Sequence, residues 1–117
     1  MPYLKPAEQA RLDAAIRAAE QACRAEISVY LGTVEGDQRD FATSLHNTMV
    51  LPSRSILIMV DPSRRIVEIV TGGHVRRTLT DEEAADAVAQ MGAAFAEGDL
   101  AGGLVRGVQL LGEHALD

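Results

Sequence analysis

The chain has 117 residues, of which 47% are hydrophobic and 24% charged, and this composition predicts one globular domain spanning residues 1–117. Its formal net charge of −6 excludes nucleic acid as the main partner, because phosphate backbones are bound by clustered cations. Its one cysteine excludes an internal disulfide.

The first residues and the longest apolar run predict a soluble cytoplasmic chain. Met1–Lys5 contains no apolar signal-peptide core, and Ile56–Val60 is far too short to span a membrane. A chain that had lost a natural signal or anchor would instead belong to the cell envelope.

The N-terminal part predicts a helix, a strand and a second helix. Pro6 opens the first helix, whose apolar stripe is Leu12, Ile16, Ala19 and Cys23. Residues 26–33 alternate apolar and polar side chains, as a strand does. After a loop over residues 34–39, Asp40 is expected to cap the second helix. The apolar stripe of that helix is Phe41, Leu45 and Met49.

A β-hairpin is predicted in the middle of the chain. Ser55–Val60 is nearly all apolar, which is typical of a central strand buried on both faces. Asp61–Arg64 suits a type I turn, and the β-branched residues of Arg65–Thr71 favour a second, antiparallel strand. The chain can turn sharply at Gly72 and Gly73. A short extra strand is expected over residues 75–79.

The C-terminal part predicts two helices. Thr80 and Glu83 form a capping box, and the helix that follows places Ala84, Val88, Met91 and Phe95 on one stripe. Gly98 ends this helix, and Asp99 caps the next. That last helix carries Leu100, Leu104, Val108 and Leu111. Its Gly103 and Gly107 lie four residues apart and are expected to allow close packing against a neighbour.

The element order α-β-α-β-β-α-α predicts an α/β fold with a small mixed β-sheet flanked by helices. The first two strands are joined through a helix, so they should be parallel with a right-handed crossover. The hairpin then adds an antiparallel strand. Such a sheet must be covered by helices to bury its faces, which gives an α/β sandwich.

Three segments make the chain similar to the TPM domain family. They are RRIVEIVTGG, LTDEEA and FAEGDLAGGLVRGVQLL, which start at Arg64, Leu79 and Phe95. The resemblance covers residues 6–111 and implies the same fold. Members of that family are associated with acid phosphatase activity, with divalent-cation binding, and with membrane-protein assembly or repair.

The chain departs from the TPM pattern at two acidic features. The family often has Asp-Asn-Gly before the central strand, where this chain has Ser53-Arg54-Ser55. The family also often has a Glu four residues after the glycine that ends the hairpin, where this chain has Arg76. The resemblance implies Ca²⁺ or Mg²⁺ as a cofactor, and both replacements argue against it. They indicate a divergent bacterial branch of unknown function.

One edge of the predicted sheet collects carboxylates. Loops at the carboxyl ends of strands are common ligand sites in open α/β sheets, and carboxylates can hold a hard cation. The metal candidates are Glu35, Asp37, Asp40 and Asp61. The alternative is a solvated loop in which Asp40 and Asp61 only cap a helix and a turn. No calcium-loop spacing is present.

The opposite edge combines arginines, a glycine turn and a helix N-terminus, which together suit an anion such as phosphate. The anion-binding candidates are Arg54, Gly72, Gly73, His74, Arg76, Arg77 and Thr80. In the alternative interpretation these arginines form surface ion pairs with Asp81, Glu82 and Glu83, which contribute little.

His74 is the candidate catalytic residue, as a general acid or nucleophile, with a surface turn residue as the alternative. His46 and His114 are expected to face solvent or to pack at the periphery, and Cys23 is expected to be a buried, inert thiol.

Two functions from different classes fit these patterns. The first is a non-catalytic binding or assembly module, with a protein partner or a phosphate-like anion as its ligand. The second is a phosphoester hydrolase of low or narrow activity, similar to an acid phosphatase, which would use Arg54, His74 and Arg76.

Overall fold

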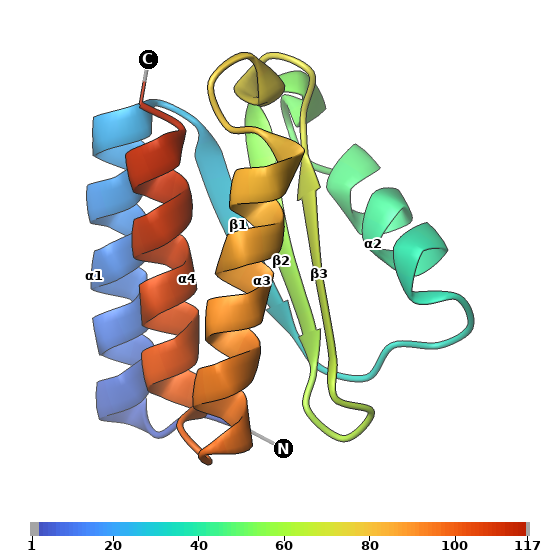
Figure 1. Cartoon of the computed structure of the whole chain (residues 1–117), viewed down its shortest axis with the longest axis vertical. Coiled ribbons are helices and arrows are strands. Elements are labelled where there is room, and N and C mark those ends of the chain that lie inside the picture. The colour runs from blue at the N-terminus through green and yellow to red at the C-terminus, as the bar shows by residue number, and fades with distance from the viewer. Residues whose placement is uncertain (1–2, 117) are drawn as a thin grey trace.

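A computed structural model describes residues 3–116 of the chain, and its element order is the predicted one (Figure 1). The elements are α1 (Pro6–Cys23), β1 (Glu26–Leu31), α2 (Gln38–Asn47), the 3₁₀ helix η1 (Pro52–Arg54), β2 (Ser55–Asp61), β3 (Ile66–Thr71), the 3₁₀ helix η2 (Val75–Arg77), α3 (Asp81–Ala96) and α4 (Leu100–His114). Within residues 3–116, none of these helices combines the length and the apolar character that a membrane crossing requires.

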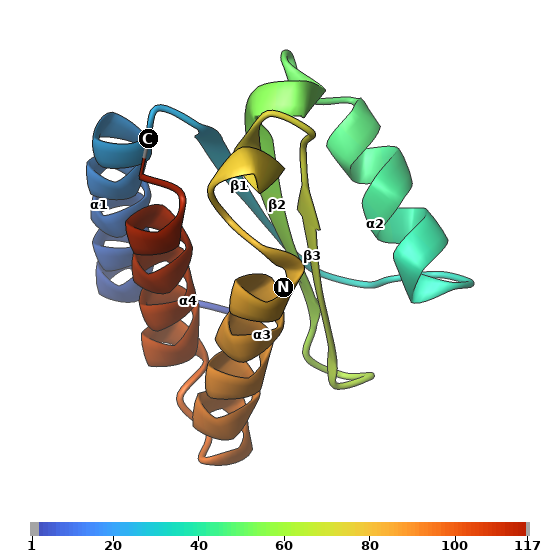
Figure 2. The ribbon, with the colours of Figure 1, turned by 45° about the horizontal axis from the view of Figure 1, so that its top comes forward.

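The three strands form one mixed sheet in the order β1-β2-β3. β1 is parallel to β2, with Ile27 opposite Ile56, and β2 is antiparallel to β3, with Ile58 opposite Ile69. Helices α1, α3 and α4 cover one face of the sheet, and α2 lies on the other side (Figures 1 and 2). The predicted α/β sandwich is therefore confirmed.

The core is divided in two by β2, all of whose residues are buried. Ile56, Ile58 and Val60 belong to the larger apolar cluster, which includes residues of α1, α3 and α4. Leu57 and Met59 belong to the smaller cluster beneath α2. This alternation places the largest apolar area under three helices, which explains why a chain with so few aromatic residues can fill a core.

Helix α4 packs closely against α3 and α1 because it carries glycines at the contacts. A Cβ atom built on Gly103 would lie 2.5 Å from Cε1 of Phe95, and one on Gly107 would lie 2.3 Å from Sδ of Met91. On the α1 side, a Cβ on Gly112 would lie 2.8 Å from Cβ of Ala19. The predicted role of Gly103 and Gly107 in close packing is confirmed.

Three predicted boundaries in the first crossover are wrong. α2 ends at Asn47, so Met49, which was predicted on its apolar stripe, lies beyond the helix. β1 ends at Leu31 rather than at residue 33, because its pairing with β2 stops at Leu31 opposite Val60; just beyond, the Tyr30 hydroxyl donates to the Thr33 carbonyl at 2.7 Å. α2 begins at Gln38 because the Asp37 carboxylate, rather than that of Asp40, accepts from a backbone N–H and caps the helix.

Two details of the hairpin region also differ from the prediction. Asp61 belongs to β2, while Arg65 lies outside β3 because its backbone is left-handed, with φ of 56°. The extra strand expected over residues 75–79 is the 3₁₀ helix η2. Local carbonyls accept from the amides of this segment: Arg76 N donates to Gly72 O at 3.0 Å and Arg77 N to His74 O at 3.2 Å, so these amides are not available for strand pairing.

The close approach of Gly72 to the backbone of η1 can be tested by substitution. A Cβ atom there would lie 2.0 Å from the Pro52 carbonyl oxygen, whereas one on Gly73 would lie 3.9 Å from the Arg76 guanidinium. We expect Gly72→Ala to lower the free energy of unfolding by about 1–3 kcal/mol, as overpacking against backbone does. The matched control Gly73→Ala should have a much smaller effect in urea denaturation. Equal effects of both substitutions would contradict this account.

Candidate functional site

The segment that follows β3 is held against η1 by backbone hydrogen bonds. Gly72 N donates to Ser55 O at 3.0 Å, and His74 N donates to Ser53 O at 2.9 Å. These bonds lie at the amino edge of the sheet, where β1 and β2 begin and β3 ends. They place His74 beside Arg54, as the anion-site hypothesis requires.

Five of the seven predicted anion residues line one of two hollows at the amino edge, and Arg77 and Thr80 line neither. The first, which we name the α1 hollow, has a volume of about 150 Å³. It is lined by Cys23, Arg24, Ala25, Arg54, His74, Val75, Thr78 and Ala115. The second, the α2 hollow, has a volume of about 350 Å³. Of the predicted residues, only Gly72, Gly73 and Arg76 line the α2 hollow.

The α1 hollow brings together cationic or donor side chains from three separate segments. Arg24 follows α1, Arg54 ends η1, and His74 precedes η2. Arg24 and Arg54 are exposed and form no ion pair within residues 3–116. Sequence reasoning missed Arg24, because its position depends on how the end of α1 packs near the start of β2.

His74 has a defined orientation in this hollow. Its Nδ1 lies 3.1 Å from Nη1 of Arg77. A guanidinium group can only donate, so Nδ1 is the acceptor and the ring proton is on Nε2. His74 therefore offers an N–H donor from its other nitrogen.

The cations near the α2 hollow are already engaged with the protein. Arg39 Nη1 donates to Ile69 O at 2.9 Å and to Glu68 Oε2 at 3.2 Å, and the Arg76 guanidinium donates to the Thr71 carbonyl. These carbonyls belong to β3, which is an edge strand of the sheet. Arg39 and Arg76 thus protect that edge, a common use of charged side chains on exposed strands.

His46 lines the α2 hollow and corrects a prediction. It was expected to be solvent-facing or peripheral, but only 5% of it is exposed, and Nε2 donates to the Ser55 carbonyl at 2.9 Å. The buried position follows from the helical period, because His46 lies four residues after Ala42, which is fully buried.

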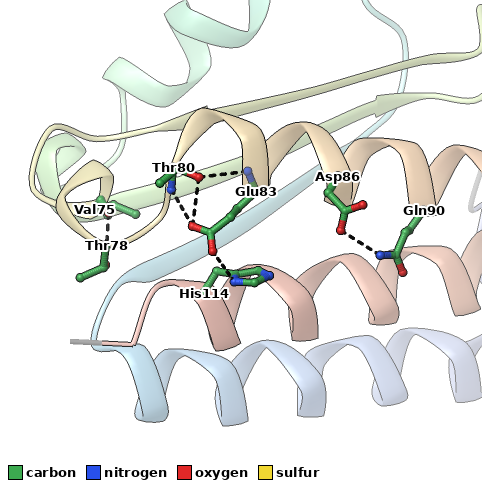
Figure 3. Close-up of polar contacts among 7 residues, drawn as sticks. All are labelled: Val75, Thr78, Thr80, Glu83, Asp86, Gln90 and His114. Atoms are coloured by element: carbon green, nitrogen blue, oxygen red, sulfur yellow. Dashed lines mark hydrogen bonds and ion pairs between the residues drawn. The ribbon is translucent and has the colours of Figure 1, made fainter.

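Thr80 lines neither hollow, and its polar groups are used in the capping box (Figure 3). Its hydroxyl accepts from Glu83 N at 3.1 Å, and its amide donates to Glu83 Oε1 at 2.9 Å. The hydrogen bond from the Thr80 amide is the main cause that lowers the pKa of Glu83. Glu83 Oε2 also lies 2.6 Å from Nδ1 of His114, which is half-buried and joins the ends of α3 and α4.

The ion pairs of the alternative interpretation are absent from residues 3–116, where Arg54, Arg76 and Arg77 are not paired with any acid of the first turn of α3.

Asp61 is a structural residue of the carboxyl edge. It is completely buried, and its carboxylate accepts from Val34 N at 2.9 Å and from the Ser63 hydroxyl at 2.8 Å. The Val34 amide is the largest influence on the pKa of Asp61 and lowers it, against the opposing effect of burial. Arg64 donates to the Val34 carbonyl at 2.7 Å, so Asp61 and Arg64 together hold the loop after β1 against the hairpin.

The other acidic candidates are not drawn together around a cation. Asp37 caps α2, and Glu35 and Asp40 are exposed. Within residues 3–116, no three His, Cys, Asp or Glu side chains lie close enough to share a metal ion. A Ca²⁺ or Mg²⁺ site at this edge stays a prediction.

The chain is similar to a family of unknown function and to uncharacterized proteins. A family described as a domain of unknown function, DUF5130, matches residues 1–112. The uncharacterized proteins MT2543 and Rv2468c of Mycobacterium tuberculosis are each 29% identical to the chain over 105 residues. The match covers 90% of the chain, which spans 63% of the length of these curated relatives.

Solved structures share the fold. The BA42 protein of Bizionia argentinensis is 27% identical, with a TM-score of 0.82 over 97% of this chain and 82% of that one. The N-terminal domain of the cg2496 protein of Corynebacterium glutamicum has a TM-score of 0.80 at 18% identity, over 95% of this chain and 73% of that one. At that identity the second likeness shows the fold alone.

The lowered pKa of Asp61 leads to a prediction about how the stability of the fold depends on pH. Its folded-state pKa lies below the ordinary value of about 3.9, so its contribution to stability is present above that pH and is lost as the pH falls through the folded-state pKa. We therefore expect Asp61→Asn to lower the free energy of unfolding, measured by urea denaturation, at neutral pH. The difference in this free energy between the variant and the native protein should become smaller in acid.

Glu83 titrates in the native protein and in Asp61→Asn alike, so it does not change the difference in their free energies of unfolding. The exposed Asp40→Asn is the matched control. A gap that keeps its size from neutral to acid pH would show that the charge on Asp61 does not stabilise the loop.

Proposed function

The chain belongs to the DUF5130 family, and from that premise we propose that it is a non-catalytic binding module whose α1 hollow holds a phosphate-like anion. One observation carries the proposal: Arg24, Arg54 and His74, from segments far apart in the sequence, line the same hollow. Guanidinium groups bind phosphate and carboxylate through paired, charge-assisted hydrogen bonds.

The size of the α1 hollow limits its ligand. Its volume of about 150 Å³ is smaller than the ~300 Å³ at which pockets for drug-sized molecules begin. A single phosphate or carboxylate group fits this limit, either as a free ion or as the exposed group of a larger partner. A protein that carries such a group is the partner expected for an assembly module.

The TPM-like character of the chain is part of the same proposal. The segments starting at Arg64, Leu79 and Phe95 support it through their similarity to that family. Arg54 and Arg76 replace acidic features of that family's pattern, which supports a ligand of the opposite charge. Because Arg76 donates to the Thr71 carbonyl, Arg54 is the stronger candidate for ligand contact.

The proposal predicts a titration result. Inorganic phosphate should shift the amide NMR signals of residues 24–25, 53–55 and 74–78 in a saturable way. Arg54→Gln should weaken phosphate binding by about 10- to 100-fold, because a hydrogen bond to a charged group contributes roughly 1.5–3 kcal/mol. Arg17→Gln, an exposed change on α1 outside the hollow, is the matched control.

Equal phosphate affinity in Arg54→Gln and Arg17→Gln would refute the anion site. Shifts confined to residues 72–73 and 76 would move the ligand to the α2 hollow. Saturable shifts at Glu35–Asp40 with Ca²⁺, and none with phosphate, would favour the cation hypothesis instead.

Phosphoester hydrolysis is the second candidate, favoured by the presence of His74 in the same hollow as Arg24 and Arg54. The hydrogen bond from Arg77 to Nδ1 counts against it, because a ring with Nδ1 engaged and a proton on Nε2 presents no free nucleophile. We therefore expect no turnover of p-nitrophenyl phosphate above the buffer rate, with or without Ca²⁺ or Mg²⁺. Turnover that is lost in His74→Ala but kept in His114→Ala would establish the hydrolase.

A further inference from the structure

A third cavity, separate from both hollows, lies at the carboxyl edge. Its volume is about 330 Å³, and we name it the hairpin cavity. Its lining includes Asp61, Arg65, Ile66, Gly92, Phe95 and Leu100. Figure 1 shows the β2–β3 turn and the α3–α4 connection at the same end of the molecule. Most of the lining is apolar, and Arg65 is its one basic residue.

Gly92 is the first unexpected residue in this lining. It lies inside α3, where glycine is the least favourable residue after proline. Gly103, Gly107 and Gly112 of α4 are explained by close contacts, but a Cβ atom on Gly92 would have no atom within 4 Å. No packing contact therefore requires glycine here, and its effect is to leave the cavity open.

Arg65 is the second unexpected residue in the lining of the hairpin cavity. Its φ of 56° is in the left-handed region, which glycine and asparagine adopt at lower cost than arginine. The side chain is exposed and forms no ion pair within residues 3–116. Local choices that oppose backbone preference tend to occur at functional sites, and Gly92 and Arg65 line the same cavity.

We propose that the hairpin cavity binds a small amphipathic carboxylate. Ile66, Val67, Phe95 and Leu100 provide the apolar walls for its hydrocarbon part. The Arg65 guanidinium pairs with its carboxylate. Asp61 also lines the cavity, but its carboxylate is saturated by the donors of Val34, Ser63 and Arg64. The volume lies at the lower end of the range for small-molecule sites, so the ligand is compact.

The test is an amide NMR titration with octanoate. Octanol carries the same hydrocarbon part without the charge, and octylammonium reverses the charge. We expect saturable shifts at residues 65–67 and 92–100, with octanoate binding more tightly than either analogue. Arg65→Gln should weaken octanoate binding about tenfold and leave octanol binding unchanged. Arg106→Gln, an exposed change on α4, is its control.

Gly92→Leu fills the cavity and should abolish octanoate binding, whereas Ala93→Leu adds similar bulk to an exposed position of the same helix and should not. Gly92→Ala adds one methyl group to open space and should weaken octanoate binding while raising the thermal unfolding midpoint. It keeps the proposal testable if the leucine variant fails to fold.

Three results would overturn the proposal: no saturable shift with octanoate, binding that is unaffected by substitutions of Gly92, or binding of octylammonium that equals that of octanoate. Failure of phosphate to bind the α1 hollow would leave this site untouched, because the two cavities share no residue.

Discussion

The central strand β2 is buried along its whole length, so the polar groups at its two ends must find partners inside the protein. At one end, the Ser55 carbonyl accepts from His46 and Gly72, which fixes α2 and the segment after β3. At the other end, the Asp61 carboxylate binds backbone donors of the loop after β1 and of the hairpin turn. These two residues therefore connect β2 to the segments that border both edges of the sheet.

The distribution of charge makes an acidic chain compatible with the proposed anion site. The net charge of −6 belongs to the whole chain, but Arg24 and Arg54 gather at one small hollow without ion pairs among residues 3–116. At the short range of a hydrogen bond, the local charge rather than the net charge decides which ion is bound. The net charge therefore argues against an extended polyanion as the partner, but it does not argue against a small anion.

Periodicity and capping residues were sufficient to predict the fold, because helices and strands differ in the period of their apolar side chains. The stripe from Leu12 to Cys23 and the capping box at Thr80 were correctly identified in this way. The site was harder to predict. Tertiary packing brings Arg24 to the same hollow as Arg54, and it leaves the space around Gly92 open. No local sequence pattern records either result. The sequence is enough to assign the candidate residues to opposite edges of the sheet, but it does not show that one edge is divided into two hollows.

Helix α4 is held between two neighbours at glycine contacts that leave it little room to tilt or slide. Its 15 residues extend over about 22 Å, with Leu100 at the hairpin cavity and Ala115, just after its last turn, at the α1 hollow. Because Leu100 borders one cavity and Ala115 the other, a substitution that displaced α4 along its axis would alter both cavities at once.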